Sequence, residues 1–167
     1  YSQIVQQPTE ENCRLYLDQA PLSTMRDVVR GYLTYLEKNK GEVALTVTVE
    51  SLQLGKREGW YMSSHSYRYE VAVAGKTILN EDFSGGDGRV IDVKRQTPLR
   101  AKLADSILLS ASVVDPGIRD DTTYSQSKSL KISELSQGYM LSVGGGHQVR
   151  FSLSGVPSAP ALPSWRP

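Results

Sequence analysis

The chain has 167 residues, of which 39% are hydrophobic and 22% are charged, and its net charge at pH 7 is +1. These values predict a soluble folded protein of one domain, or of one domain with a small satellite. They exclude an overall electrostatic field for nucleic acid or membranes, so a basic patch has to be local. The single cysteine, Cys13, excludes an intramolecular disulfide framework and fits a reducing compartment.

Targeting signals are not recognisable in the sequence. No apolar run approaches the roughly 18 residues that a membrane span requires. The chain begins with Tyr1 rather than Met, so we expect an excised piece of a longer protein or a chain whose leader is gone. The compartment is therefore left open: cysteine usage favours the cytoplasm, and peripheral membrane association is the alternative.

The first 41 residues carry helical patterns. Residues 1–8 are polar and are expected to fray, and Thr9 caps a first helix that ends at Pro21. A second helix carries six large apolar side chains between Met25 and Leu36 and stops at Gly41. The segment 1–41 is therefore predicted to contain an α-helical hairpin. We expect the β-sandwich, or a missing neighbour, to cover its apolar face.

From Glu42 onward the apolar period changes from helical spacing to strict alternation, which is typical of strands. About eight short strands separated by Gly, Asp and Ser turns predict an antiparallel β-sandwich or barrel over residues 42–155. The expected strands span residues 43–54, 66–75, 76–84, 88–95, 106–115, 128–135, 139–145 and 147–155. The Pro-rich tail, 156–167, is expected to be a linker or tether unless Leu162 and Trp165 dock onto the fold.

The strand sequences resemble those of C2 domains from Leu45 to about Gly138. The segment LTVTVESLQL is similar to the opening strand of that family, SYRYEVAVAGKTI to the strand after the first loop, and LLSASVVDPGIRDD to the strand that enters the third loop. The resemblance implies a mainly β protein, an antiparallel C2-like sandwich of about eight strands. It also implies a module that binds phospholipid or protein partners through loops at one end, often with calcium.

This chain departs from the calcium-binding pattern of that family. Its first loop, GKREGWYMSSHS, contains no aspartate, and only Asp115, Asp120 and Asp121 resemble the acidic third loop. Calcium needs six to eight oxygen ligands, whereas Asp-Pro-Gly and Asp-Asp segments are also ordinary turn chemistry. We therefore predict no metal site and no tight binding of calcium.

The helical segment CRLYLDQAPLSTMRDVVRGYLTYLE resembles a single tetratricopeptide-like hairpin of the kind seen in bacterial multidomain proteins. The similarity covers about 25 residues. One such unit cannot bury its own apolar face. The resemblance implies that the chain belongs to a larger protein or assembly.

Two groups of residues are candidates for contact with a ligand or partner. Trp60, Tyr61 and Met62 are costly to expose, so they are either core anchors, a membrane-inserting tip or a protein hot spot. The second group is a basic cluster that would suit anionic head groups, unless it is a solvated loop. Its members are Lys94, Arg95, Arg100 and Lys102.

Catalytic motifs are not recognisable either. Cys13 falls on the apolar face of a predicted helix, where a thiol packs as a small hydrophobe, and His65 and His147 lack ligand-like neighbours. The glycine-rich segment Val143 to His147 lacks the lysine and hydroxyl residue of a phosphate loop and is expected to be a hairpin turn. We predict no catalytic residues, no cofactor, no nucleic-acid partner and no small-molecule substrate.

The expected function is a non-enzymatic protein-interaction or scaffold module within a larger protein, with a protein as the partner. The alternative is a peripheral membrane module that binds anionic phospholipid head groups. A remote alternative is an accessory domain of an enzyme.

Overall fold

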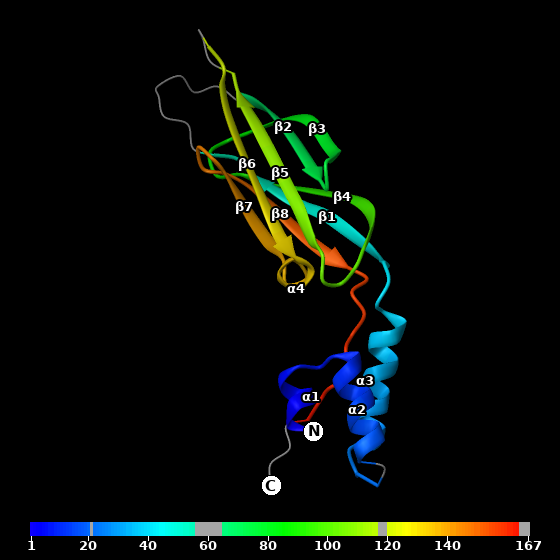
Figure 1. The fold of residues 1–167 in the computed structure, drawn as a ribbon. Helices are drawn as coiled ribbons and strands as arrows, with labels where there is room; N and C mark the ends of the chain where they lie inside the picture. Colours follow the sequence, from blue (N-terminus) through cyan, green and yellow to red (C-terminus); the bar gives the residue numbers. More distant parts are fainter. Residues whose placement is uncertain (21, 56–64, 117–119, 164–167) are drawn as a thin grey trace. The chain divides into compact units, whose positions relative to one another are not determined.

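The computed structural model describes residues 1–20, 22–55, 65–116 and 120–163. The chain forms two compact units. One comprises Ala44–Val156, and the other combines the two ends of the chain, Tyr1–Val43 and Pro157–Pro167. Figure 1 shows the elements of both units.

The larger unit is an antiparallel β-sandwich of two four-stranded sheets among the described residues. Sheet A has the strand order β4-β1-β8-β7, and sheet B has the order β3-β2-β5-β6. This confirms the predicted mainly β fold class and its eight strands. The strands are β1 (Val43–Gln53), β2 (His65–Val73), β3 (Lys76–Gly85), β4 (Val90–Ala101), β5 (Ser106–Asp115), β6 (Thr122–Lys131), β7 (Tyr139–Gly144) and β8 (His147–Ser154).

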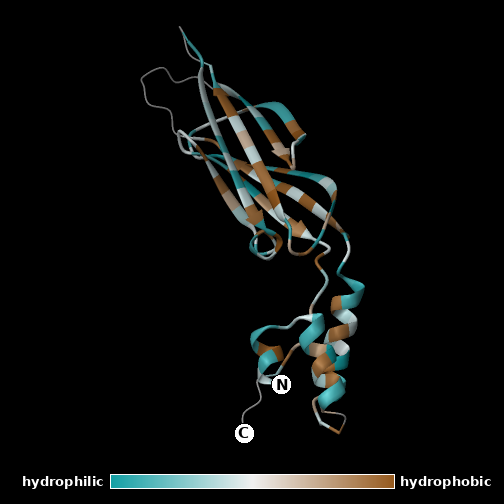
Figure 2. Ribbon diagram, in the orientation of Figure 1, coloured by the Kyte–Doolittle hydropathy of each residue, from teal (hydrophilic) through white to brown (hydrophobic). Residues whose placement is uncertain are grey.

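Alternation along the strands builds the core of the sandwich. In β5, the side chains of Ile107, Leu109, Ala111 and Val113 are buried, and the residues between them face outward. The same alternation appears along the strands of Figure 2 as hydrophobic and hydrophilic bands. β5 pairs with β6 in an unbroken antiparallel register from Ser106 opposite Lys131 to Asp115 opposite Thr122.

The bounds of β4 and β6 differ most from the prediction, and β6 begins at Thr122 rather than at residue 128. β4 continues through Pro98 to Ala101 instead of ending at Arg95. It is an edge strand of sheet A, and edge strands tolerate proline because part of their backbone N–H groups have no partner strand.

The segment ISEL is a short helix, α4 (Ile132–Leu135), and not the end of a strand. The Glu134 carboxylate accepts a hydrogen bond from the Lys131 backbone N–H, at 2.9 Å, and so closes the first turn. Gly138, at φ +85, follows the turn. Ile132 and Leu135 are both buried because their spacing of three places them on one face of the turn.

The smaller unit contains three helices among the described residues: α1 (Ser2–Gln6), α2 (Glu10–Gln19) and α3 (Arg26–Lys38). Its core is Ile4, Cys13 and Val29, one residue from each helix, each at most 1% exposed. Residues 1–8 therefore do not simply fray, as the sequence suggested, because Ile4 anchors α1 in this core.

The tail also belongs to this core. Leu162 packs against the buried cluster, and the Tyr1 hydroxyl donates a hydrogen bond of 2.7 Å to the backbone carbonyl of Pro163. The apolar face of α2 and α3 is thus covered by α1 and by the tail, two segments from opposite ends of the chain. We had expected the sandwich or a missing neighbour to cover it. Trp165 lies outside the described residues.

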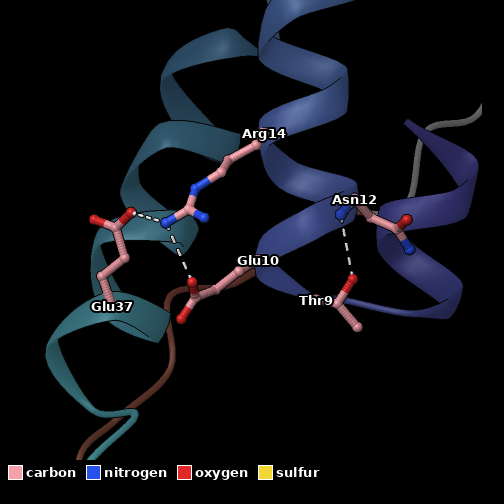
Figure 3. Close-up of polar contacts among 5 residues, drawn as sticks. All are labelled: Thr9, Glu10, Asn12, Arg14 and Glu37. Atoms are coloured by element: carbon pink, nitrogen blue, oxygen red, sulfur yellow. Dashed lines mark hydrogen bonds and ion pairs between the residues drawn. The ribbon is translucent and has the colours of Figure 1, made fainter.

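Polar contacts cap the start of α2 and join α2 to α3 (Figure 3). Thr9 caps α2, as predicted, by accepting a hydrogen bond from the Asn12 backbone N–H. Arg14 of α2 forms ion pairs with Glu10, at 3.2 Å, and with Glu37 of α3, at 2.9 Å. Of the two exposed pairs, only Arg14–Glu37 joins α2 to α3, and each contributes little to stability.

Candidate functional site

The candidate residues from the sequence fall into two groups with different outcomes. Trp60, Tyr61 and Met62 lie outside the described residues, so the prediction about them stays a prediction. Lys94, Arg95 and Arg100 lie on β4 and Lys102 follows it, so this cluster belongs to an edge strand rather than a loop. Arg95 forms an ion pair with Glu81 of β3, which neutralises one of the four cations.

The outer face of sheet B contains a hollow of about 410 Å³, which we call the serine hollow. It spans β2, β5 and β6. Side chains that share a face of a sheet recur at every second residue, and the register aligns them in rows across the strands. The hollow is lined chiefly by the outward side chains Glu70, Ala72, Ser110, Ser112, Ser125 and Ser127.

Two rows of small side chains form the floor of the serine hollow. In one row, Glu70 of β2 is opposite Ser112 of β5, which is opposite Ser125 of β6. In the next row, Ala72, Ser110 and Ser127 are aligned in the same way. Four hydroxyl groups therefore converge on a surface that no large side chain fills. Hydroxyl groups both donate and accept hydrogen bonds, so the floor can contact many polar ligands.

Larger side chains bound the hollow at both ends. Arg68, one step before Glu70 on the same face of β2, is paired with Asp82 of β3 at 3.2 Å. At the other end, Leu108 of β5 stands opposite Ser129 and is 46% exposed. The hollow thus offers hydroxyl groups on its floor, one carboxylate at its side and an apolar rim.

A second candidate lies inside the sandwich at the start of β8. His147 is 2% exposed, and its Nδ1 atom lies 3.0 Å from the backbone nitrogen of Gly55 and 2.6 Å from the hydroxyl oxygen of Tyr69. The rings of Tyr67 and Tyr124 are also close, with centroid distances of 4.7 and 5.9 Å from that of His147. This histidine cluster joins the end of β1 to strands β2, β6 and β8.

Burial sets the protonation of this cluster. It lowers the pKa of His147, and the nearby Asp115 carboxylate partly opposes that shift. Burial also raises the pKa of Tyr69, and the neighbouring Tyr67 raises it further. Both groups are therefore neutral at pH 7, in which state they hydrogen-bond to each other.

The glycine-rich segment before His147 packs against an aromatic ring. It is the turn between β7 and β8, as predicted. A Cβ atom on Gly145 would lie 2.7 Å from the Tyr124 ring, and one on Gly55 would lie 2.1 Å from the Gly145 carbonyl oxygen. Only glycine fits at these close approaches. The segment therefore serves packing, and the histidine that follows it is held by the fold.

Three of the four edge strands, β3, β4 and β6, are protected against pairing with another strand. β4 carries Pro98 and a positive φ at Lys94, and the pairing of β3 with β2 contains a bulge after Val71. In β6, Lys128 lies opposite the buried Leu109 yet is exposed, so it is a charge on the core-facing side of an edge strand. Such devices block strand addition. They favour a face over an edge as the binding surface.

Sequence reasoning missed the serine hollow and the role of His147. The hollow had a signal, because Ser110 and Ser112, and likewise Ser125 and Ser127, recur at the spacing of two that places them on one face of a strand. The histidine cluster left no recognisable pattern in the sequence, because Gly55, Tyr69 and His147 are far apart in it.

Metal ligands do not gather in the described part of the chain, where no group of three or more His, Cys, Asp or Glu could hold an ion. The prediction about calcium is not tested by this, since residues 56–64 and 117–119 are outside it. No helix among the described residues is long and apolar enough to cross a membrane.

Comparisons with known proteins find similarity in structure only. No protein-family model matches the chain, and neither does any curated protein. A solved C2 domain matches with a TM-score of 0.43 and 11% identity, covering 67% of this chain and 98% of its own. A C2 domain of plant extended synaptotagmin 1 matches with a TM-score of 0.42 and 11% identity, covering 71% and 98%.

Human GIVD cytosolic phospholipase A2 also matches, with a TM-score of 0.43 and 11% identity, over 72% of this chain but only 18% of the enzyme. The β-sandwich expected from the sequence is confirmed by its own two four-stranded sheets, and these C2 domains are similar to it in fold. At these low TM-scores and identities, no ligand, partner or activity is carried over from these proteins.

Proposed function

We propose that the chain is a non-enzymatic protein-interaction or scaffold module and that the serine hollow is its binding surface. The single observation that carries the proposal is the hollow itself, about 410 Å³ on the outer face of sheet B. Small side chains let a partner approach the sheet closely, and the exposed Leu108 at the rim supplies apolar contact. A typical protein interface contains about ten direct hydrogen bonds, and the hydroxyl groups of the floor can supply some of them.

The charge of the hollow favours a basic protein segment over a lipid head group. Glu70 is the one ionisable side chain among the described residues that line it. A lysine or arginine of the partner can form a charge-assisted hydrogen bond with this carboxylate. Phospholipid head groups that carry net negative charge would instead be repelled. We therefore propose a polypeptide partner with at least one basic residue.

The membrane alternative depends on Lys94, Arg100 and Lys102, which are exposed. They lie on or beside β4 in sheet A, whereas the hollow belongs to sheet B. Arg95 is already paired with Glu81. The alternative therefore predicts a different set of sensitive residues, which makes it separable by experiment.

The proposal that the chain is not an enzyme rests on the state of its perturbed groups. Tyr69 and His147 have the clearest pKa shifts in the sandwich, and strongly shifted groups are candidates for catalysis. Both are buried, and His147 is hydrogen-bonded to a backbone amide. The pair is therefore interpreted as part of the fold.

The test is selection of peptides from a random phage-displayed library on the immobilised 167-residue chain, followed by titration of the synthesised peptides. We expect selected peptides to contain a basic residue. Ser112→Trp fills the floor and should weaken their binding by at least about tenfold, and Glu70→Gln should weaken it mainly at low salt. Ser154→Trp, an exposed serine of β8 in sheet A, is the matched control and should bind normally.

Flotation with phosphatidylserine–phosphatidylcholine vesicles tests the alternative function, binding to anionic membranes. We expect the chain not to float. If it floats, and if Lys94→Glu with Arg100→Glu abolishes flotation while Ser112→Trp does not, the membrane function replaces the proposed one. Peptide binding that is equal for Ser112→Trp and Ser154→Trp would also contradict the proposal.

A further inference from the structure

The tautomer of His147 follows from its hydrogen bonds. The Gly55 backbone N–H can only donate, so the Nδ1 atom that lies 3.0 Å from this nitrogen carries a lone pair. The neutral ring therefore has its proton on Nε2. The Tyr69 hydroxyl, at 2.6 Å from the same Nδ1, also donates to it. The Nδ1 atom of His147 therefore hydrogen-bonds both to Gly55, just after β1, and to Tyr69 of β2.

The groups that face the His147 ring come from β2, from β6, and from the ends of β5 and β1. Tyr67 and Tyr69 approach it from β2, and Tyr124 approaches it from β6. Asp115, the last residue of β5, acts on it electrostatically. From β1, the contact is the backbone of Gly55. Asp115 is the one carboxylate among these groups.

Gly55 has little freedom to find another acceptor. It is buried, and a Cβ atom added to it would lie 2.1 Å from the Gly145 carbonyl oxygen and 3.0 Å from Nε2 of His147. The backbone here is already in close contact with the turn between β7 and β8. An unpaired buried N–H is costly, so loss of the His147 acceptor would drive Gly55 away from the ring.

The Asp115 carboxylate can stabilise the positive charge of a protonated His147 ring. Its Oδ1 atom is buried and has no hydrogen-bond partner among the described residues. Its carboxylate also favours the protonated form of His147. A protonated His147 ring could therefore be balanced by a buried carboxylate oxygen that is not already used in another hydrogen bond among the described residues.

We propose that His147 is a proton-operated latch: the neutral ring holds Gly55 and Tyr69 through Nδ1, and the protonated ring releases Gly55 and is balanced by the Asp115 carboxylate. A proton from solvent binds the Nδ1 lone pair, so that both ring nitrogens become donors. The Tyr69 hydroxyl then accepts from Nδ1–H and turns its own hydrogen to the Gln53 carbonyl oxygen, 3.4 Å away. The Gly55 N–H alone loses its partner.

The latch should operate in mild acid. Burial lowers the pKa of His147 below its ordinary value of 6.5, and Asp115 limits that fall. Acid therefore loosens the end of β1 beside the turn between β7 and β8. This inference concerns a different part of the sandwich from the serine hollow and holds whether or not the hollow binds a partner.

Amide hydrogen exchange of the 167-residue chain, followed by NMR, tests the latch. The protection factor of Gly55 is compared between about pH 7.5 and about pH 5 with that of Ala74, whose N–H donates to the Leu108 carbonyl oxygen at 2.8 Å. We expect protection of Gly55 to fall at least about tenfold relative to Ala74. Using protection factors removes the intrinsic pH dependence of exchange from both amides.

Three variants identify the cause. His147→Asn keeps an acceptor near the Nδ1 position and cannot titrate, so protection of Gly55 should no longer depend on pH. Asp115→Asn should move the midpoint to lower pH, because it removes the charge that favours the protonated ring. Tyr69→Phe removes a group that donates to the neutral ring and accepts from the protonated one, so the fall in Gly55 protection should persist in it while its midpoint changes little.

The latch would be wrong if protection of Gly55 followed that of Ala74 at both pH values in the wild type. It would also be wrong if the fall persisted in His147→Asn. Should that variant fail to fold, the Asp115→Asn midpoint decides, since an unchanged midpoint excludes Asp115 as the partner of the protonated ring.

Discussion

The close approach of Gly55 to the turn between β7 and β8 leads to a sharp prediction for Gly55→Ala. The added methyl group would lie 2.1 Å from the Gly145 carbonyl oxygen and 3.0 Å from the Gly145 carbonyl carbon. Both are backbone atoms, so no side-chain rotation relieves the clash. The turn cannot retreat either, because Gly145 is packed against the Tyr124 ring on another side.

The expected cost follows from overpacking in a filled interior, which is typically about 1–3 kcal/mol. For a chain of this length, that cost lowers the melting temperature by roughly 3–10 °C. Differential scanning calorimetry and urea denaturation would measure it. Gly86→Ala is the matched control, since no atom lies within 4 Å of a Cβ added there and φ is not positive. If Gly55→Ala were as stable as Gly86→Ala, the packing described for this end of the sandwich would be refuted.

Three further predictions concern the other unit, calcium and pH. Ile4→Ala should destabilise the helical unit by about 2–4 kcal/mol and abolish the protection of amides in α2 and α3 against hydrogen exchange. Leu22→Ala, at a side chain that is 96% exposed, should have no effect. An equal loss of exchange protection at Ala74 in the sandwich would contradict this prediction. Isothermal titration should detect no micromolar binding of calcium, and micromolar binding that disappears in Asp115→Ala would prove the prediction wrong. Because the pKa of His147 is lowered in the folded state, the contribution of this residue to the free energy of unfolding is complete above about pH 6.5. This contribution declines as the pH falls toward the folded pKa, by up to about 1.4 kcal/mol per pH unit. In urea titrations, His147→Asn should remove this dependence of the unfolding free energy on pH, and an unchanged dependence would count against the prediction.

Local patterns in the sequence were sufficient for the strands but not for every boundary. The alternation in β5 fixed its bounds at Ser106–Asp115, as predicted. The segment after β6 was misleading because Leu130 and Ile132 continue an alternation, whereas Leu135 reveals a helical turn only through its spacing from Ile132. The predicted strand ended at Arg95, whereas β4 continues through Pro98, because an edge strand tolerates proline and edge position is not visible in the sequence.

Contacts between distant segments could not be predicted. The helical unit is completed by Ile4 and Leu162, which lie near opposite ends of the chain. The same holds for the candidate sites: the serine hollow requires the order β2-β5-β6, and His147 meets Gly55 only because β1 pairs with β8. Alternating serines indicate an outward face, but they do not indicate which strands lie side by side.

The most direct test of the proposed function is an NMR titration of the isotopically labelled chain, first with a selected basic peptide and then with anionic bicelles. We predict that the peptide shifts the amide signals of Ser110, Ser112, Ser125 and Ser127, and that bicelles leave the spectrum unchanged. Shifts confined to Lys94–Lys102 on addition of bicelles, with no response of the serine hollow to the peptide, would contradict the proposal that this surface binds a protein partner.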